Sequence, residues 1–233
     1  MSRDKGYAKS GSGLKESIDF AENNYVEVHN VSKRFRDAEV LHQVSLNLER
    51  GLIYGIVGNN GSGKTVLMKC ICGFLPVTSG EIRVNGKRIG KDLDFPESLG
   101  AIIETPGFLN QLTGRKNLEI LADLRKRIDR KDITAVLEKV GLDPDLKKTV
   151  SKYSLGMRQR LGIAQAIMED PELLILDEPF NGLDKHGTAE IRQLILELKS
   201  QGKTILLASH NGEDIRVLCD VVYEMDGGRL HRL

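Results

Sequence analysis

Eight consecutive residues carry the clearest chemical pattern in this chain. They read Gly58, Asn59, Asn60, Gly61, Ser62, Gly63, Lys64 and Thr65. The glycines let the backbone turn until successive N–H groups face one anion. Lys64 adds a positive charge near the outer phosphates, and Thr65 offers a hydroxyl to Mg²⁺. This is the complete phosphate-binding P-loop pattern, and it predicts that the chain binds a nucleoside triphosphate with Mg²⁺.

The segments on either side of the P-loop match the elements that it requires. The apolar run over residues 52–57 predicts a strand. Residues 65–74 predict a helix with one apolar stripe, formed by Val66, Leu67, Cys70, Ile71 and Phe74. Such a helix would point the positive end of its dipole at the phosphates. A glycine-rich turn without a ligand is the alternative, and the strand and helix context argues against it.

A second chemical pattern lies at residues 173–178. Four apolar residues, 173–176, are followed by Asp177 and Glu178, which predicts a buried strand of a parallel sheet that ends in two carboxylates. Ligands gather at such strand ends. Asp177 can hold Mg²⁺, usually through a water, and Glu178 can orient or deprotonate the water that attacks the γ-phosphate. Ordinary solvation of a strand end is the alternative, which the P-loop upstream makes much weaker.

Composition narrows the class of protein. The chain has 233 residues, is 40% hydrophobic and has a formal net charge of +1, which gives no general electrostatic argument for nucleic-acid binding. No apolar run approaches the roughly 18 residues of a membrane span, and the N-terminus lacks a secretory core. Three cysteines favour neither a disulfide framework nor a four-ligand zinc site. We therefore expect a cytoplasmic chain.

The order of elements predicts two regions. Residues 1–24 are polar and read as a flexible extension, while residues 25–233 form one α/β domain. Within it, apolar stripes at residues 117–127, 132–140 and 155–168 predict a helical insertion over about residues 107–170. Basic residues between 115 and 131 fit the solvated face of an amphipathic helix better than a nucleic-acid patch.

Residues 153–160 read Tyr-Ser-Leu-Gly-Met-Arg-Gln-Arg and stand just before the acidic strand. With the P-loop and the acidic pair, this segment resembles the signature of the nucleotide-binding cassette of ABC transporters, over residues 25–233. Most members read Leu-Ser-Gly-Gly-Gln there, followed by a basic residue, Gln and Arg. Ser154, Gly156, Gln159 and Arg160 match, whereas Tyr153, Leu155 and Met157 depart from the consensus. The resemblance implies a P-loop NTPase fold: a central, mainly parallel sheet, an N-terminal antiparallel β region and a helical insertion.

The resemblance also implies several site residues. Ser154 and Gly156 would bind the γ-phosphate of ATP held by a second cassette, and Asp184 would couple the two sites or cap the helix that follows it. His210 would contact the γ-phosphate. Phe35 would stack on adenine, although guanine would stack equally well, and core or edge packing is its alternative role.

Glu104 departs from the cassette pattern, because most members carry Gln at this position. A carboxylate here binds Mg²⁺ more strongly than an amide but repels a nearby phosphate. Glu104 is then protonated, held back from the phosphates or bound to the metal. The surrounding wording, Ile-Ile-Glu-Thr-Pro-Gly-Phe at residues 102–108, resembles the cassettes of bacitracin- and lantibiotic-type exporters and immunity transporters.

The resemblance leads to a functional expectation. The chain would bind and hydrolyse ATP with Mg²⁺, pair with a second cassette, either identical or related, and drive a separate membrane permease from the inner face of the cell membrane. Its role would be export of, or immunity to, an antimicrobial peptide or antibiotic. A helix of the permease would dock at residues 105–112 beside Phe108 and Leu109, unless Phe108 is only a core anchor. The alternatives are a soluble cassette ATPase acting on the ribosome or nucleic acid, and an ATP-dependent binding module that hydrolyses poorly.

Overall fold

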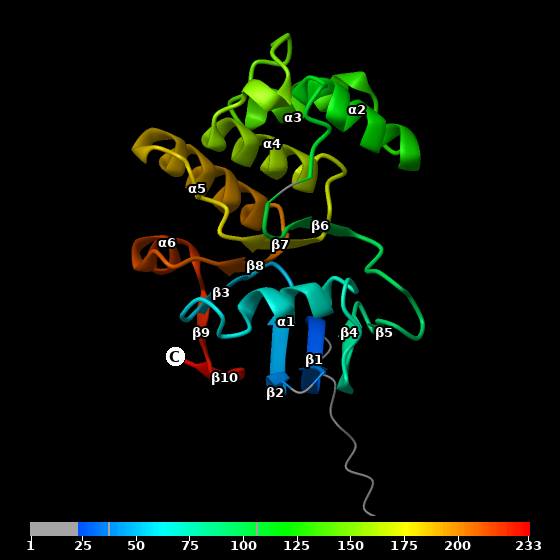
Figure 1. The fold of residues 1–233 in the computed structure, drawn as a ribbon, viewed down its shortest axis with the longest axis vertical. Helices are drawn as coiled ribbons and strands as arrows, with labels where there is room; N and C mark the ends of the chain where they lie inside the picture. The colour runs from blue at the N-terminus through cyan, green and yellow to red at the C-terminus, as the bar shows by residue number, and fades with distance from the viewer. Residues whose placement is uncertain (1–22, 37, 106) are drawn as a thin grey trace, which may run out of the picture.

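The computed structural model describes residues 23–36, 38–105 and 107–233, which are arranged in two sheets with helices between and above them (Figure 1). The smaller sheet is antiparallel, with the order β2-β1-β4-β5. Its strands are β1 (Asn24–Phe35), β2 (Ala38–Glu49), β4 (Ser79–Val84) and β5 (Lys87–Arg88). The predicted extension over residues 1–24 lies almost entirely outside the described residues.

The larger sheet carries the chemical motifs. Its order is β10-β9-β3-β8-β7-β6, and every neighbouring pair is parallel except β9 and β10. The strands are β3 (Ile53–Val57), β6 (Leu99–Ile102), β7 (Leu173–Asp177), β8 (Thr204–Ala208), β9 (Val221–Asp226) and β10 (Arg229–Arg232). All five residues of β7 and of β8 are buried, as unbroken apolar runs in a parallel sheet should be.

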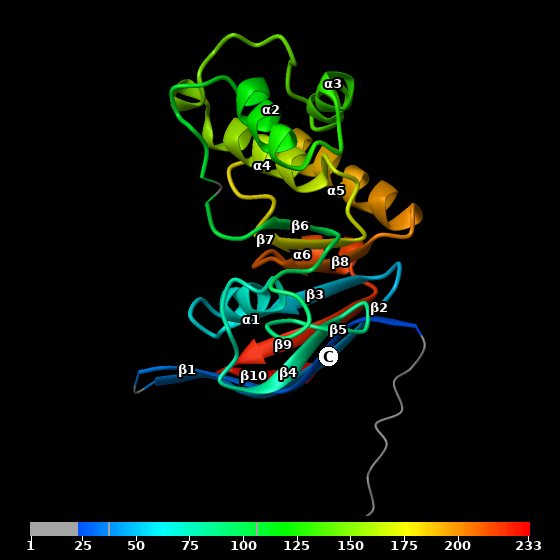
Figure 2. The same cartoon turned by 90° about the vertical axis from the view of Figure 1, so that its right-hand side faces the viewer.

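The helices divide into a central one and an upper group (Figure 2). Helix α1 (Lys64–Ile71) lies between the two sheets, and Leu67, Met68 and Ile71 belong to the apolar cluster that joins them. The upper group contains α2 (Gly114–Arg125), α3 (Arg130–Lys139), the short 3₁₀ helix η1 (Val150–Lys152) and α4 (Leu155–Ile167). Helices α5 (Lys185–Ser200) and α6 (Gly212–Leu218) follow β7 and β8.

The predicted fold class is confirmed, with two local differences. Helix α1 ends at Ile71 rather than continuing to residue 74, because Gly73 adopts a φ of 82° that breaks the helix. Phe74 therefore leaves the predicted apolar stripe and is 53% exposed. The second difference is at the C-terminal end, where β9 runs to Asp226 and turns back into the antiparallel strand β10, which no sequence pattern above predicts.

The three cysteines are free thiols set in packed surroundings. Burial raises the pKa of the Cys70 thiol to about 11 and that of the Cys72 and Cys219 thiols to about 12. A thiol reacts as its thiolate, so these groups are inert near neutral pH. The cysteines are therefore not candidates for catalysis, and the candidate reactive groups are those of the P-loop and the acidic strand.

Candidate functional site

The P-loop connects β3 to α1 and has the strained backbone that its glycines allow. Gly58, Gly61 and Gly63 have φ values of 143°, 81° and 113°. A Cβ added at Gly58 would lie 2.2 Å from the carbonyl oxygen of Met225, so only glycine fits there. The Lys64 ammonium donates hydrogen bonds to the carbonyl oxygens of Gly58, at 2.6 Å, and Asn59, at 3.0 Å. The loop thus curls around its own lysine.

The cavity beside the P-loop fits a triphosphate and Mg²⁺. It has a volume of about 310 Å³ and is lined by Val40, Asn60, Gly61, Gly63, Lys64, Thr65, Val66, Asp177 and Glu178. The hydroxyl of Thr65 donates to Oδ2 of Asp177 at 2.7 Å, which places two oxygen ligands side by side. The buried hydroxyl of Ser62 has no hydrogen-bond partner among the described residues.

Mg²⁺ here would depend on the nucleotide as well as on the protein. No group of three or more His, Cys, Asp or Glu side chains able to hold a metal ion occurs in the part of the chain that the structure describes. Mg²⁺ commonly binds through one or two protein oxygens together with substrate phosphates. Thr65 and Asp177 match that arrangement, and the metal would neutralise charge on the phosphates.

Glu178 is held next to this pair by backbone contacts from two elements. Its N–H donates to the Ala208 carbonyl oxygen at 2.9 Å, and its own carbonyl accepts from the Gln159 side chain at 3.3 Å. Its φ is 50°, a left-handed conformation that costs energy for any residue except glycine. The carboxylate Oε2 lies 2.8 Å from Nδ1 of His210. The structure therefore brings the two predicted catalytic residues of the strand ends into contact.

A buried network fixes the loop that carries His210. The Ser209 hydroxyl donates to Asp214 at 3.0 Å, and the Arg192 guanidinium donates two hydrogen bonds to the other oxygen of Asp214. Asp214 is only 1% exposed, and Arg192 comes from α5. The sequence analysis missed this network and the role of Gln159 as well. Arg192 stands 22 positions before Asp214, and Gln159 stands 19 positions before Glu178, so no local pattern could indicate these contacts.

The signature residues lie away from the phosphate cavity. Ser154 is the N-cap of α4, where its hydroxyl accepts from the N–H of Met157 at 3.2 Å. A Cβ added at Gly156 would lie 2.7 Å from the carbonyl oxygen of Gly182, so the signature packs against the loop after β7. Asp184 caps α5 by accepting from the N–H of Gly187 at 2.7 Å. None of Ser154, Gly156 and Asp184 lines the cavity at the P-loop.

Phe35 stands at the end of β1, in the turn that leads to β2. Its ring is 41% exposed, which argues against the role of a core residue. The Lys33 ammonium lies 4.8 Å from the ring centre, and Val40, two residues into the facing strand, lines the phosphate cavity. An exposed aromatic ring near the phosphates is suited to stacking on a base.

Glu104 is placed outside the phosphate cavity. Its carboxylate Oε1 lies 2.7 Å from the Lys69 ammonium on α1, and it is not among the residues that line the cavity. In this arrangement the carboxylate is paired with Lys69 rather than with a residue of the cavity lining. In the neighbouring loop, Phe108 packs against the helical core, while Leu109 is 46% exposed.

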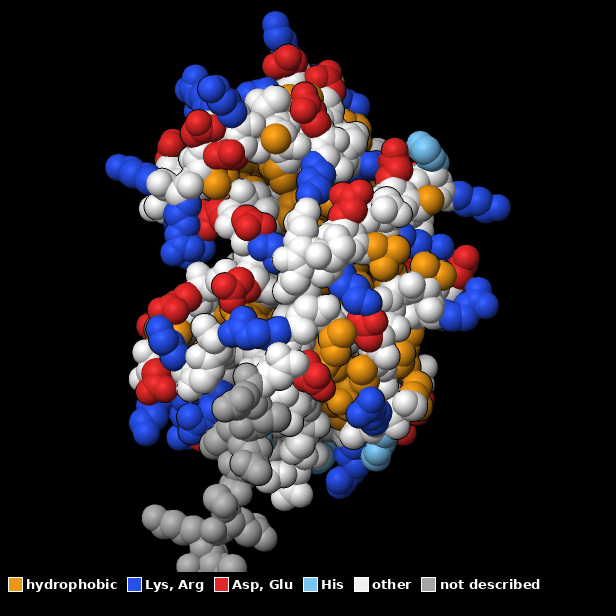
Figure 3. Space-filling model, turned by 180° about the vertical axis from the view of Figure 1, so that it is seen from behind, with side chains coloured by type: hydrophobic (Ala, Val, Ile, Leu, Met, Phe, Trp, Pro, Cys, Tyr) orange, Lys and Arg blue, Asp and Glu red, His pale blue; other side chains and the backbone are white. Residues whose placement is uncertain are grey.

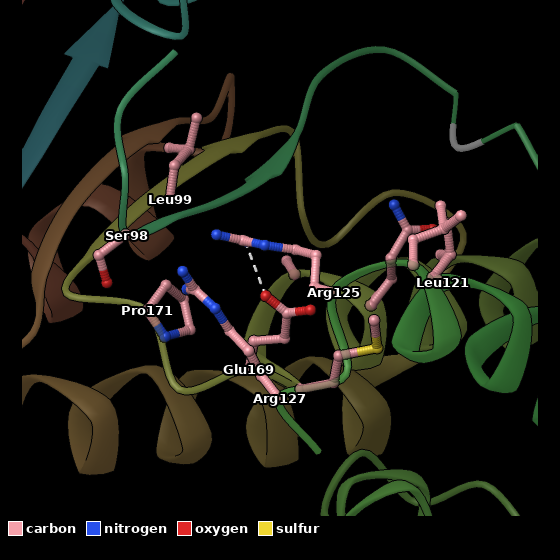
Figure 4. A pocket seen from close by; sticks show the side chains of 11 residues that line it. Ser98, Leu99, Leu121, Arg125, Arg127, Glu169 and Pro171 are labelled. Carbon is pink, nitrogen blue, oxygen red and sulfur yellow. Dashed lines mark hydrogen bonds and ion pairs between the residues drawn. The ribbon is translucent and has the colours of Figure 1, made fainter. Parts of the chain in front are cut away.

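Two adjoining hollows form a groove between the upper helices and β6. They share the lining residues Leu99, Arg125, Gln165 and Ala166. Exposed apolar side chains border it at Phe74, Phe95 and Leu124. Figure 4 shows one of these hollows, where Arg125 on α2 and Glu169 after α4 form an ion pair of 2.7 Å. The groove combines exposed apolar side chains with charged residues, among them Arg125, Arg127 and Glu169, that line it.

Together, the P-loop, the acidic strand end, the histidine loop and the signature helix define an ATP-binding cassette. Residues 41–181 match the family described as ABC transporter. The chain belongs to the ABC transporter family as an ATP-binding subunit, and it is an ATPase. No helix among the described residues is long and apolar enough to cross a membrane.

Relatives with curated names share most of the chain. YybJ of Bacillus subtilis (strain 168), an uncharacterized ABC transporter ATP-binding protein, is 44% identical over 205 residues, which cover 88% of this chain and 94% of that protein. The bacitracin transport ATP-binding protein BcrA of Enterococcus faecalis is 44% identical over 207 residues, covering 88% and 67%. The lantibiotic transport ATP-binding protein SrtF of Streptococcus pyogenes is 36% identical over 198 residues, covering 84% and 85%.

The fold is shared with solved cassettes. The dimeric structure of the ABC transporter cassette MJ0796 matches with a TM-score of 0.81 and 23% identity, covering 89% of this chain and 97% of that one. An ATP-binding subunit of an ABC transporter matches with a TM-score of 0.80 and 28% identity, covering 90% of each chain. The predicted resemblance to ABC cassettes of the bacitracin and lantibiotic type is confirmed.

Proposed function

We propose that this chain is the motor subunit of an exporter that removes, or gives immunity to, an antimicrobial peptide or antibiotic. It works as one of two cassettes attached to a membrane permease at the inner face of the cell membrane. The names of BcrA and SrtF support the class of cargo. The contact between Glu178 and His210 beside the Thr65–Asp177 pair carries the proposal, because it assembles a hydrolytic site on the P-loop.

The side chains have separate tasks in this proposal. Lys64 and the loop N–H groups bind the phosphates, while Thr65 and Asp177 hold Mg²⁺, which offsets phosphate charge. Glu178 orients the attacking water and takes its proton, and His210 holds the carboxylate and contacts the γ-phosphate. Phe35 stacks on the base. Glu104, now paired with Lys69, would supply a further oxygen ligand for Mg²⁺.

The positions of Ser154 and Gly156 support a paired arrangement. Neither residue lines the cavity of its own P-loop, yet the hydroxyl and N–H groups at the start of α4 form a site for an anion. A second cassette placed head to tail supplies the phosphate. Binding of two ATP molecules then closes the pair, and hydrolysis allows it to open.

The groove between the upper helices and β6 supports a permease partner. Phe74 and Phe95 are 53% and 56% exposed, their ring centres are 6.1 Å apart, and Leu124 is 77% exposed. Exposed apolar surface with a polar border is typical of a protein contact. We assign this groove, together with the loop around Leu109, to a cytoplasmic segment of the permease.

The distribution of charge argues against the alternative of a nucleic-acid or ribosome ATPase. Figure 3 shows acidic and basic side chains intermingled over one whole face, without a large basic patch. The formal net charge is +1. Binding to a phosphate backbone needs clustered Lys and Arg side chains. The full acidic pair likewise argues against a module that only binds ATP.

The first experiment is an affinity purification from native membranes, with the Glu178→Gln variant as bait and ATP present. We expect a polytopic membrane protein in near-equal amount, identified by mass spectrometry. Adding Leu124→Asp in the groove should abolish its recovery, whereas the matched change Val217→Asp, at an exposed apolar residue of α6, should not. Recovery of ribosomes or nucleic-acid proteins without a permease would overturn the proposal.

A further inference from the structure

The ion pair between Lys69 and Glu104 joins two elements of the nucleotide site. Lys69 belongs to α1, the helix that begins at the P-loop, and Glu104 follows β6. Their charged atoms are 2.7 Å apart, with side-chain exposures of 26% and 64%. Glu104 has a φ of 60°, which is uncommon for a non-glycine residue. Because Glu104 does not favour this φ by itself, the surrounding structure must hold its backbone in this conformation.

The pair links the Glu104 carboxylate to the helix that also carries the proposed metal ligand Thr65. Lys69 lies four positions after Thr65 in α1, so the two side chains share one face of the helix, about 5–6 Å apart at Cβ. Thr65 contacts Asp177, while Glu104 lies outside the lining of the phosphate cavity. The carboxylate is therefore paired with the helix that carries Thr65, yet it is not part of the cavity that Thr65 and Asp177 line.

We propose that Lys69 is a positioning residue that keeps the Glu104 carboxylate away from Mg²⁺ and the phosphates until nucleotide binds. This inference rests on the proposed ATP site and deepens it. In this proposal Glu104 has two alternative partners of opposite charge, the Lys69 ammonium and Mg²⁺ bound beside Thr65 and Asp177, and it can pair with only one at a time. Lys69 thus competes with Mg²⁺ for the carboxylate. A neutral Gln, which most cassettes carry here, could not form the ion pair.

Both side chains of the Lys69–Glu104 ion pair are partly exposed, which limits how strongly the pair can hold the carboxylate. Exposed ion pairs are weak and shift an equilibrium by about fivefold at most. Such a contact is strong enough to hold a side chain in the empty site and weak enough to yield to a bound metal. Removing Lys69 should therefore favour the metal-bound position of Glu104 by about two- to fivefold.

The test is a double-substitution cycle measured by nucleotide binding. The chain and its variants Lys69→Met, Glu104→Gln and Lys69→Met with Glu104→Gln are titrated with AMP-PNP by calorimetry, once with saturating MgCl₂ and once with EDTA. Lys69→Arg, which keeps the charge, is the conservative variant. Thermal unfolding of each protein shows whether it is folded.

The proposal predicts a change in AMP-PNP affinity opposite to the one that simple charge loss would give. Loss of a positive charge beside a triphosphate should weaken binding on Coulombic grounds alone. Instead, Lys69→Met should tighten binding two- to fivefold, only with Mg²⁺ and only when Glu104 is present, while Lys69→Arg matches the parent chain. Weaker binding, or the same change in the Glu104→Gln background, would overturn the role of Lys69. Failure of the parent chain to bind AMP-PNP would instead overturn the proposed function.

Discussion

At the scale of single residues, the proposed mechanism makes turnover depend on the carboxylate of Glu178. Its contact with His210 at 2.8 Å and its place beside Asp177 suit it to accept a proton from water. Glu178→Gln keeps the shape of the side chain but removes the proton acceptor. We expect ATP turnover to fall at least about 100-fold, with ATP binding retained.

Turnover by phosphate release and binding by calorimetry will check this expectation. Glu138→Gln is the matched control, since Glu138 is an exposed carboxylate on α3 far along the chain from the site. That control should keep full turnover. A Glu178→Gln protein that hydrolyses ATP normally would remove Glu178 from the catalytic role.

The sequence alone predicts those site residues that directly follow a recognisable strand in the chain. The P-loop, Asp177 and Glu178 each follow an apolar strand, and strand ends of a parallel sheet meet at one edge. Lys69 could not be found in this way, because its partner stands 35 positions further on. The pattern of residues in a helix does not indicate which charged residue of another element will contact Lys69.

At the scale of elements, the turn between β9 and β10 braces the P-loop. The N–H of Gly228 donates to the Ser62 carbonyl oxygen at 3.0 Å, and the Gly228 carbonyl accepts from the N–H of His42 at 2.8 Å. The turn thus joins the phosphate loop to β2. The sequence analysis did not anticipate β10, because these contacts bring together segments more than 150 positions apart. The buried strand β7, by contrast, is predicted by its apolar residues 173–176.

Two adjacent glycines allow this brace to be tested. A Cβ at Gly228 would lie 2.3 Å from the Val40 carbonyl oxygen, whereas a Cβ at Gly227 would meet nothing within 4 Å. Both residues have positive φ, so both alanine variants carry backbone strain, but only Gly228→Ala adds a clash. We expect Gly228→Ala to weaken ATP binding about tenfold relative to Gly227→Ala. Equal affinities in calorimetry would contradict a bracing role.

At the scale of the whole molecule, the separation of the signature from the P-loop predicts assembly in pairs. The Glu178→Gln variant with ATP and Mg²⁺ should shift from 25.9 kDa to about 52 kDa, twice the chain mass, in light scattering. Ser154→Asp in that background should block the shift, because Asp can still cap α4 but places a negative charge where a phosphate must sit.

A matched change separates this effect from helix capping. Thr113 caps α2 in the same way, and Thr113→Asp should leave pairing intact. Binding of ATP to single chains should survive in both variants, since neither residue lines the cavity. Pairing by the Ser154→Asp protein would show that the signature does not receive a phosphate.

The left-handed backbone of Glu178 affects which substitutions at this position would stabilise the protein. A glycine at this position would relax the chain, since residues held at such angles cost of order 1–3 kcal/mol. The fold would then gain thermal stability by the same replacement that removes the carboxylate proposed to be catalytic. Under the proposed mechanism, selection for turnover would act against a more stable and inactive relative that is one substitution away in this sequence.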